Sequence, residues 1–277
     1  MNYVRPVRQA LLWVYTSKNE LVLSIPMNYA DTLVPLIREI RPMVLPYWGN
    51  VSSTAKSASP ADLVTALDTG VETFIAGRLR ELYPHIPFVG EEFGGIRDGQ
   101  KHWLMDPIDG TAHFVRGLPF CTSMLALVED DQVLFSLIYD FIHDHVYWAQ
   151  KGQGAFKDGV PLQVSNRPLT DAYYSYEMKL AKPENVALFS RLVGNGIMMK
   201  TVSAGWEFIM IAEGKLEARV TVDPHGKDYD FAPGALLVAE AGGVVRNIGS
   251  HTYDYRNLNF IAATPAAYED LRRIVEG

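Results

Sequence analysis

Apolar residues recur every three or four positions in two segments of the first half of the chain, a spacing typical of helices that pack on one face. The first segment spans about 33–44, and prolines in and just after it should kink or shorten the helix. The second runs from about Ala66 to Tyr83, where Thr65 and Asp68 have the pattern of a capping box. We therefore expect two amphipathic helices in this part of the chain.

Short apolar runs bounded by turn residues predict strands elsewhere. In the first half we expect two short strands within 1–27, strands at 86–90 and 102–105, and a meander of strands over 120–150. The second half should mix helices and strands. We expect helices near 183–193, 204–213 and 230–241 and a terminal helix from Pro265. Strands are expected at 216–222 and 259–263. These elements predict one compact α+β unit of stacked helix and sheet layers.

Composition and net charge limit the classes of function that are compatible with this chain. At 277 residues, with 48% hydrophobic and 21% charged residues, the chain can bury a substantial core. The net charge of −7 argues against a nucleic-acid partner, and no apolar stretch reaches membrane-spanning length. The single cysteine, Cys121, excludes an intrachain disulfide and is expected to be a small buried apolar residue. We expect a cytoplasmic protein without a membrane partner.

Acidic residues follow two of the predicted strands. The string Asp106–Thr111 comes directly after one apolar strand, and Gly90–Glu92 comes directly after another. If the strands lie side by side, Glu91 meets the first of these aspartates at one sheet edge. Carboxylates are the ligands that Mg²⁺ prefers, and the amides of Gly110 and Thr111 could bind a phosphate oxygen. Taken alone, however, the first string is explained equally well by a turn with a helix-capping Asp106, and for the second an exposed turn is the favoured explanation.

Two further aspartates have simple structural explanations of their own. Asp230 stands at a predicted helix start, where an anionic cap is favourable by about 1 kcal/mol. Asp68 could merely close the capping box with Thr65. Neither residue points to chemistry by itself.

Taken together and in order, four acidic segments resemble the signature set of the inositol monophosphatase family, the lithium-sensitive magnesium phosphatases. These segments are Asp62–Asp68, Gly90–Glu92, Asp106–Thr111 and Asp230–Gly234. The resemblance covers about residues 28–277 and implies the layered α-β-α-β-α sandwich of the inositol monophosphatase and fructose-1,6-bisphosphatase type. It divides the chain into an N-terminal hairpin extension (1–27), a metal-binding α+β half (28–150) and an α/β half (151–277) that contributes Asp230 and substrate contacts.

The resemblance also implies two or three Mg²⁺ ions and assigns their ligands. The first ion would be bound by Glu91, Asp106 and the carbonyl oxygen of Ile108. The second would be bound by Asp106, Asp109 and Asp230. Metal ions of this kind explain how an acidic protein binds an anionic substrate, because they reverse the local potential.

Catalytic and substrate-binding residues follow from the same resemblance. Asp68, Thr111 and Glu91 would form the catalytic group, in which the first two position and deprotonate the attacking water. The amides of Gly110 and Thr111 would bind the phosphate, while Ala204 and Asp223 lie near positions that contact the alcohol in similar enzymes. The sequence has Tyr229, Pro233 and His113 where the family usually has other residues, but none of these changes removes a ligand.

The implied function is magnesium-dependent hydrolysis of a small phosphate monoester by metal-activated water, most simply inositol 1-phosphate or a similar sugar or polyol phosphate. The alternatives are a 3′-phosphoadenosine nucleotide, which the string Ala212–Gly214 favours, fructose 1,6-bisphosphate and histidinol phosphate. A different class, a non-catalytic regulatory protein on the same fold, also stays open. The expected partners are the small phosphorylated substrate and a second copy of the chain, as in relatives that form homodimers. His225 is interpreted as a solvated turn residue.

Overall fold

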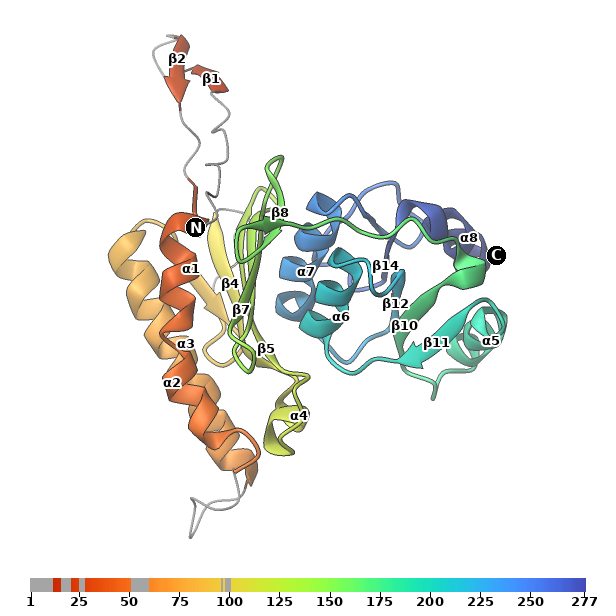
Figure 1. Ribbon diagram of the computed structural model, residues 1–277, viewed down its shortest axis with the longest axis horizontal. Helices are drawn as coiled ribbons and strands as arrows, with labels where there is room; N and C mark the ends of the chain where they lie inside the picture. The colour runs from red at the N-terminus through yellow and green to blue at the C-terminus, as the bar shows by residue number, and fades with distance from the viewer. Residues whose placement is uncertain (1–11, 16–20, 25–27, 51–59, 96, 98–100) are drawn as a thin grey trace, which may run out of the picture.

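The computed structural model describes residues 12–15, 21–24, 28–50, 60–95, 97 and 101–277. Within these ranges, five layers alternate between helices and sheets, and Figure 1 shows them side by side across the long axis of the molecule. This arrangement confirms the expected α-β-α-β-α sandwich. None of the helices in the described ranges is both long and apolar enough to cross a membrane.

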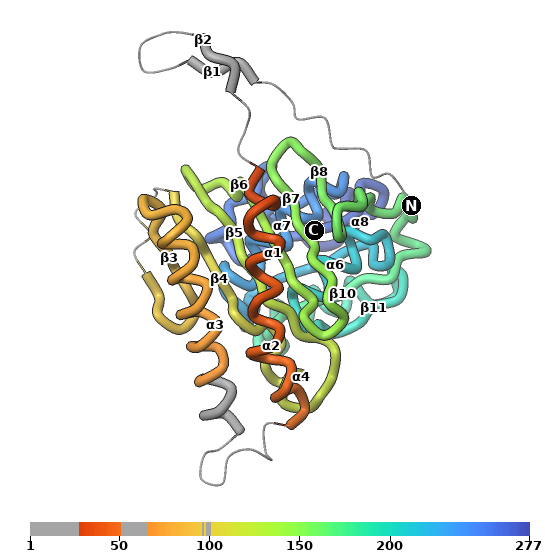
Figure 2. Tube along the Cα trace, turned by 60° about the vertical axis from the view of Figure 1, so that its left-hand side comes forward, coloured from red at the N-terminus to blue at the C-terminus, as the bar shows by residue number. Residues whose placement is uncertain are grey.

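The first outer layer consists of helices that cover one face of a seven-stranded sheet. Its elements are α1 (Ala30–Arg38), α2 (Arg41–Val44), the 3₁₀ turn η1 (Leu45–Tyr47) and α3 (Pro60–Leu82). Figure 2, turned by 60°, shows α1 and α3 running along the same face. The apolar stripe predicted near 33–44 is buried against the sheet, with Leu33, Ile37 and Ile40 at most 1% exposed.

The first sheet has the strand order β3-β4-β5-β6-β7-β8-β9. Its strands are β3 (Phe88–Gly90), β4 (His102–Asp109), β5 (Thr122–Glu129), β6 (Gln132–Asp140), β7 (His145–Gln150), β8 (Gly154–Lys157) and β9 (Val160–Pro161). The β3–β4 pair is parallel and the other pairs are antiparallel, so the predicted meander over 120–150 is confirmed. The short helix α4 (Thr111–Val115) follows β4 directly.

The middle layer consists of α6 (Ala204–Ala212) and α7 (Asp228–Glu240), which separate the first sheet from the second. The second sheet has the order β11-β10-β12-β14-β13. Its strands are β10 (Tyr173–Met178), β11 (Ile197–Lys200), β12 (Ala218–Val222), β13 (Val244–Asn247) and β14 (Phe260–Ala263). The 3₁₀ turn η2 (Leu169–Asp171) and helices α5 (Pro183–Leu192) and α8 (Pro265–Glu276) cover its outer face.

The N-terminal segment forms two strands, as the sequence predicts. Strand β1 (Leu12–Tyr15) pairs antiparallel with β2 (Leu21–Ser24). Residues 16–20, which connect the two strands, lie outside the described residues.

Three sequence predictions need correction. Helix α3 begins at Pro60, earlier than the predicted start near Ala66, so Thr65 lies within the helix and not at its start. Strand β4 does not stop before Asp106 but continues to Asp109 through an irregularity. Strands β8, β9, β10, β11 and β13 have no counterpart among the predicted elements, because their sequences lack long apolar runs.

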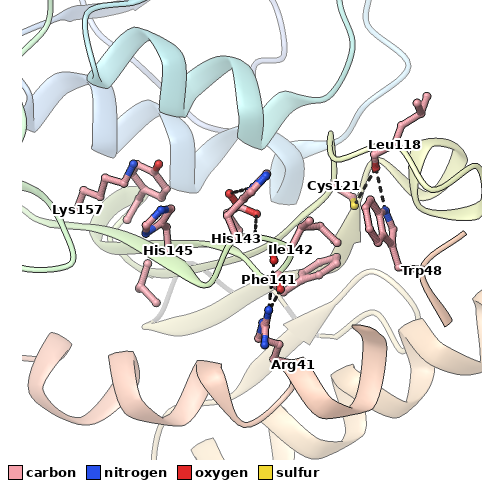
Figure 3. Close-up of polar contacts among 12 residues, drawn as sticks. Arg41, Trp48, Leu118, Cys121, Phe141, Ile142, His143, His145 and Lys157 are labelled. Carbon is pink, nitrogen blue, oxygen red and sulfur yellow. Dashed lines mark hydrogen bonds and ion pairs between the residues drawn. The ribbon is translucent and has the colours of Figure 1, made fainter. Parts of the chain in front are cut away.

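Polar contacts to backbone carbonyls fasten the helical layer to turns of the first sheet (Figure 3). The guanidinium of Arg41 donates to the carbonyls of Phe141 and Ile142 at 2.9 and 3.3 Å. The indole N–H of Trp48 donates to the carbonyl of Leu118 at 3.1 Å, and the buried thiol of Cys121 donates to the same oxygen at 3.7 Å. The contacts of Arg41 hold the turn between β6 and β7, and those to Leu118 hold the segment that follows α4. They confirm Cys121 as a buried structural residue.

Candidate metal centre

An irregularity in β4 brings two carboxylates together. Residues three apart on a regular strand point to opposite faces, so Asp106 and Asp109 would normally diverge. The pairing register with β5 shifts between these two residues, at a position where Pro107 has no N–H to donate to the ladder. Both side chains are buried, with 1% and 7% exposure. The shift therefore turns a strand end into a site with two converging acids.

The first turn of α7 supplies the third carboxylate. Asp230 lies in this turn and accepts a hydrogen bond from the backbone N–H of Lys227, the N-cap residue. One oxygen from each of Asp106, Asp109 and Asp230 lies within 4.8 Å of the other two. Residues from the two halves of the chain thus meet in one cluster of hard oxygen donors.

Strand β3 brings Glu91 to the same edge. Because β3 and β4 are parallel with Gly90 opposite Met105, the next residues along are Glu91 and Asp106. The backbone N–H of Glu91 donates to the carbonyl of Met105 at 3.2 Å, and the hydroxyl of Tyr229 approaches the Glu91 carboxylate at 3.4 Å. The meeting of Glu91 with Asp106, predicted from two strand ends, is therefore observed.

Glu72, which none of the sequence patterns singled out, holds this loop in place. Its fully buried carboxylate accepts the backbone N–H groups of Glu92 and Phe93, each at 2.9 Å. A Cβ atom on Gly90 would lie 1.9 Å from Glu72, so only glycine leaves room for this contact. Glu72 follows Asp68 by one helical turn, and that i, i+4 spacing was a signal that could have identified it.

The start of helix α6 and strand β5 supply hydrogen bonds to Asp109. One oxygen of Asp109 accepts from the Ser203 hydroxyl at 2.6 Å, the Gly205 backbone N–H at 2.7 Å and the Thr122 hydroxyl at 3.3 Å. Ala204, a predicted substrate residue, lies between the first two donors and is buried. Because all three bonds reach the same oxygen, the other oxygen of Asp109 is left for a ligand.

The remaining predicted residues occupy the turn after β4 and its surroundings. Gly110 has φ +82°, and a Cβ atom there would lie 2.3 Å from the carbonyl oxygen of Phe120. Thr111 begins α4, and its hydroxyl donates to the carbonyl of Ile108 at 3.0 Å. Asp68 is buried on α3, which contacts α4. The turn is thus built as the sequence predicts: a helix start leaves its first amides without an intrahelical partner, although that of His113 already donates to the Gly110 carbonyl at 2.8 Å.

Asp223 has partners outside this cluster. Its carboxylate forms an ion pair with Lys182 at 2.8 Å and accepts a hydrogen bond from Asn185 at 3.1 Å. Its predicted contact with substrate stays a prediction. His225 is exposed, in agreement with its interpretation as a solvated turn residue.

The acids at the centre are hard to ionise in the absence of cations. Burial raises the pKa of Asp68 to about 8, and the charges of Glu91 and Glu92 add to the shift. Burial and the charge of Asp109 raise the pKa of Asp230 to about 7. The pKa of Asp106 also lies well above its ordinary value, because the side chain is buried and faces Asp230. Buried like charges of this kind call for a counter-ion.

The donor set fits divalent cations. Oδ1 of Asp68 and Oδ1 of Asp106 are buried and have no hydrogen-bond partner among the described residues. Unpartnered carboxylate oxygens beside a cluster of three acids are what Mg²⁺ coordination requires. In contrast, a purely structural cluster would have its oxygens paired with donors.

A buried ion network lies beneath the same region. The guanidinium of Arg219 on β12 is fully buried and pairs with both Glu177 and Glu207. Glu207 also accepts the backbone N–H of Val202 at 2.7 Å, and Glu177 accepts that of His225 at 2.9 Å. The network therefore connects the loop that leads to Ser203 with the loop that leads to Asp230, and no sequence pattern pointed to it.

Comparison with known proteins agrees with this geometry. The model of the inositol monophosphatase family matches residues 26–276. Inositol monophosphatase 1 of Sus scrofa is 32% identical over 256 residues, which cover 87% of this chain and 90% of that protein. The fructose-1,6-bisphosphatase/inositol-1-monophosphatase of Thermotoga maritima is 27% identical over 259 residues, which cover 90% of this chain and 96% of that protein. The solved structure of a Thermotoga maritima IMPase has a TM-score of 0.77 at 26% identity, and the match covers 90% of this chain and 97% of that one.

Proposed function

The chain belongs to the inositol monophosphatase family, whose members are magnesium-dependent phosphatases, and on this premise we propose that it hydrolyses inositol 1-phosphate or a similar sugar or polyol phosphate. That the chain is a hydrolase of phosphoric monoesters follows from the family itself. The identity of the alcohol, the nature and number of the ions and the roles of single residues are parts of the proposal.

One observation carries the proposal: carboxylates from distant parts of the chain converge. Asp106, Asp109 and Asp230 place their oxygens within 4.8 Å of one another. We assign the second Mg²⁺ to these three residues, and the first to Glu91, Asp106 and the carbonyl of Ile108. Bound divalent cations would supply Lewis-acid stabilisation of phosphate charge and a water of lowered pKa.

The protein's own groups then position the reactants. The amides of Gly110 and Thr111, at the start of α4, would receive phosphate oxygens. Asp68, buried and without a partner for its Oδ1 among the described residues, is the group best placed to accept a proton from the attacking water. The Thr111 hydroxyl, which already donates to the Ile108 carbonyl at 3.0 Å, would orient that water with its lone pairs. Glu91 completes the catalytic group as a ligand next to Asp106.

A second substrate is favoured by one relative. The Thermotoga maritima protein, 27% identical, is named for both fructose-1,6-bisphosphatase and inositol-1-monophosphatase activity. We therefore keep fructose 1,6-bisphosphate as the first alternative, ahead of histidinol phosphate and 3′-phosphoadenosine nucleotides. We also retain the expectations of a cytoplasmic location and a homodimer as predictions, and sedimentation of the purified protein tests the second of these.

The decisive experiment is phosphate release from these four substrates side by side, titrated with Mg²⁺ and repeated with a chelator. We expect magnesium-dependent turnover, fastest with inositol 1-phosphate, and inhibition by lithium. Turnover that is independent of Mg²⁺ would contradict the metal assignment. No turnover on any monoester would favour the non-catalytic alternative.

A further inference from the structure

A fully buried arginine lies in the second half of the chain, against two aromatic rings. Arg219, on β12, is 0% exposed, and its Cζ atom lies 5.7 Å from the ring centre of Phe208 and 5.2 Å from that of Phe231. Phe208 belongs to α6, which begins next to the donors of Asp109, and Phe231 follows Asp230 in α7. Arg219 therefore contacts both helices of the middle layer close to the acidic cluster.

The stability of the fold does not by itself explain a buried arginine. Taking an arginine and two carboxylates out of water costs several kcal/mol per ion, and apolar side chains of similar volume often stabilise a core at least as well. A buried ion network can instead fix one particular geometry. The groups that Glu207 and Glu177 bind show which geometry is fixed here.

The first partner, Glu207, holds the segment that leads into α6. One of its oxygens pairs with Arg219, and the other accepts the backbone N–H of Val202 at 2.7 Å. The next residue along the chain, Ser203, donates its hydroxyl to Asp109 at 2.6 Å. The pair of Arg219 with Glu207 thus fixes the backbone directly before a donor to a proposed metal ligand.

The second partner, Glu177, holds the loop that leads into α7. One of its oxygens pairs with Arg219, and the other accepts the backbone N–H groups of His225 and Gly226 at 2.9 and 3.2 Å. A Cβ atom on Gly226 would lie 3.1 Å from a carboxylate oxygen of Asp230. The loop held by Glu177 therefore lies directly against the third carboxylate of the cluster.

The planar shape of the guanidinium allows one side chain to bind both partners at once. Nη1 donates to Glu207 and Nη2 to Glu177. Nε donates to the Thr221 hydroxyl at 3.1 Å, which fixes the orientation of the plane. A lysine ammonium carries the same charge but lacks this rigid fork of donors. Arginine is therefore the cation that can hold the two segments in a fixed relation to each other.

We propose that Arg219 is a positioning residue of the metal centre. Through Glu207 it orients Asp109. Through Glu177 it holds the loop that lies against Asp230. The inference rests on the proposed assignment of divalent cations to the acidic cluster. Loss of the rigid fork lowers the affinity for Mg²⁺ roughly tenfold, the lower end of the effect of groups that orient metal ligands.

Arg219→Lys tests the proposal, because it keeps the buried charge and removes the fork. Calorimetric titration with Mg²⁺ alone, without substrate, measures the affinity. We expect Kd to rise roughly tenfold. The control Arg272→Lys, in the exposed ion pairs of α8, should leave Kd unchanged. An unchanged Kd in Arg219→Lys would overturn the proposal.

A charge-neutral variant separates positioning from stability. The triple variant Arg219→Met, Glu177→Gln and Glu207→Gln lacks the fork but leaves no buried charge unpaired, so it should be much more stable than Arg219→Met alone. Its Kd for Mg²⁺ should still be raised roughly tenfold. Recovery of both stability and affinity would show that the network is only structural and would overturn the proposal.

Two double-variant cycles identify the residue through which Arg219 acts. Ser203 and Thr122 donate to the same oxygen of Asp109, but Ser203 follows the segment held by Glu207, whereas Thr122 lies on β5. Combined with Ser203→Ala, Arg219→Lys should raise Kd by less than the product of the two single effects. Combined with Thr122→Val, the effects should multiply. The same outcome in both cycles would contradict the proposal.

Hydrogen exchange in the metal-free protein separates this inference from the metal assignment. The amides of Val202 and Gly226 should exchange roughly tenfold faster in Arg219→Lys, while that of Phe93, bound by Glu72, should not change. If the unsubstituted protein binds no Mg²⁺, the metal centre is refuted and this inference with it. Unchanged exchange at both loops, together with Mg²⁺ binding, would refute the role of Arg219 and leave the proposed function standing.

Discussion

At the level of single residues, the site depends on which oxygen of each carboxylate accepts hydrogen bonds from the protein and which oxygen is left for a cation. Asp109 presents one oxygen to three donors, Ser203, Gly205 and Thr122, and this arrangement leaves the other free to bind a cation. Asp106, buried with an unpartnered oxygen among the described residues, has no comparable support from donors. The protein therefore holds Asp109 in position, whereas Asp106 would depend on the proposed ion.

Asp109→Asn should abolish turnover and leave the fold intact. The amide is isosteric and its oxygen can still accept the bonds from α6, but its NH₂ group would then face the cation. We expect a loss of at least about a hundredfold in kcat, since changes to groups that merely support metal ligands already cost that much. Phosphate release and circular dichroism measure the two effects. Asp131→Asn, at a surface ion pair with Arg256, is the control, and substantial residual activity of Asp109→Asn would count against the ligand role.

The raised pKa values predict how stability depends on pH without metal. The pKa values of Asp68 and Asp230, about 8 and about 7, lie above the value of 3.8 for an unperturbed aspartate. The folded chain therefore binds more protons than the unfolded chain between these values, and its stability falls as pH rises toward 8. Mg²⁺ displaces these protons, so its stabilising effect should grow over the same range.

Thermal melts at about pH 5.5 and about pH 8, with a chelator and with Mg²⁺, measure this dependence. The metal-free melting temperature should be lower at the higher pH, and the increase caused by Mg²⁺ should be larger there. Asp68→Asn removes one titrating group and should flatten the metal-free slope. A metal-free protein that becomes more stable toward pH 8 would contradict the burial of these acids in solution.

At the level of elements, the site needs helix α6 to approach strand β5 closely. A Cβ atom on Gly205 would lie 2.1 Å from the Thr122 hydroxyl and 3.0 Å from an oxygen of Asp109. Gly205→Ala must therefore displace the start of the helix and the donors that it carries. We expect a loss of roughly tenfold to a hundredfold in kcat/KM, as for other groups that orient ligands.

Gly77→Ala is the matched control for this change. Gly77 lies within α3, and a Cβ atom there would meet nothing within 4 Å. Alanine in a helix interior is favoured over glycine by about 0.5–1 kcal/mol, so the control should stabilise the fold without loss of activity. Equal activities of the two variants would show that the approach of α6 is not needed.

The buried network between β10, β12 and α6 makes a prediction about stability. Arg219→Met removes the cation and leaves the carboxylates of Glu177 and Glu207 buried without it. We expect a decrease of about 3–5 kcal/mol in the free energy of unfolding, the usual cost of breaking a buried pair. A triple variant that also carries Glu177→Gln and Glu207→Gln should recover much of this loss. Urea unfolding measures the free energy of unfolding of both variants. A loss well below this range in Arg219→Met alone would indicate that water reaches the network.

At the scale of the whole molecule, local patterns could predict layers and strand ends but not every strand. The contact of Glu91 with Asp106 required only that two apolar runs form neighbouring strands. Strand β10 was missed because Ser175 and Glu177 break its apolar pattern, and both serve the buried network around Arg219. A polar residue that is buried for the sake of a distant partner cannot be recognised from its neighbours in sequence.

The convergence of Asp109 and Asp230 could not be predicted from local sequence patterns either. They lie on different elements in different halves of the chain, and a start-of-helix aspartate is fully explained as a cap. The resemblance to a family supplied this long-range information, and the structure brings the residues together. Thr122 could not be found in this way because its role is defined by geometry alone, whereas Glu72 could have been identified from its i, i+4 spacing to Asp68.

Because the acidic cluster joins the two halves, one substitution should have opposite effects on stability with and without metal. Asp230→Asn removes a like charge from a buried group of carboxylates, so the metal-free variant should melt above the unsubstituted protein near pH 8, where these acids ionise. With Mg²⁺ the order should reverse, since saturation at about a hundred times Kd adds about 2.7 kcal/mol to a protein with an intact site and less to one without. Differential scanning calorimetry over a magnesium series measures the crossing. Parallel melting curves that never cross would mean that Asp230 serves only as a helix cap. A shared ion would then not stabilise the two halves of the chain.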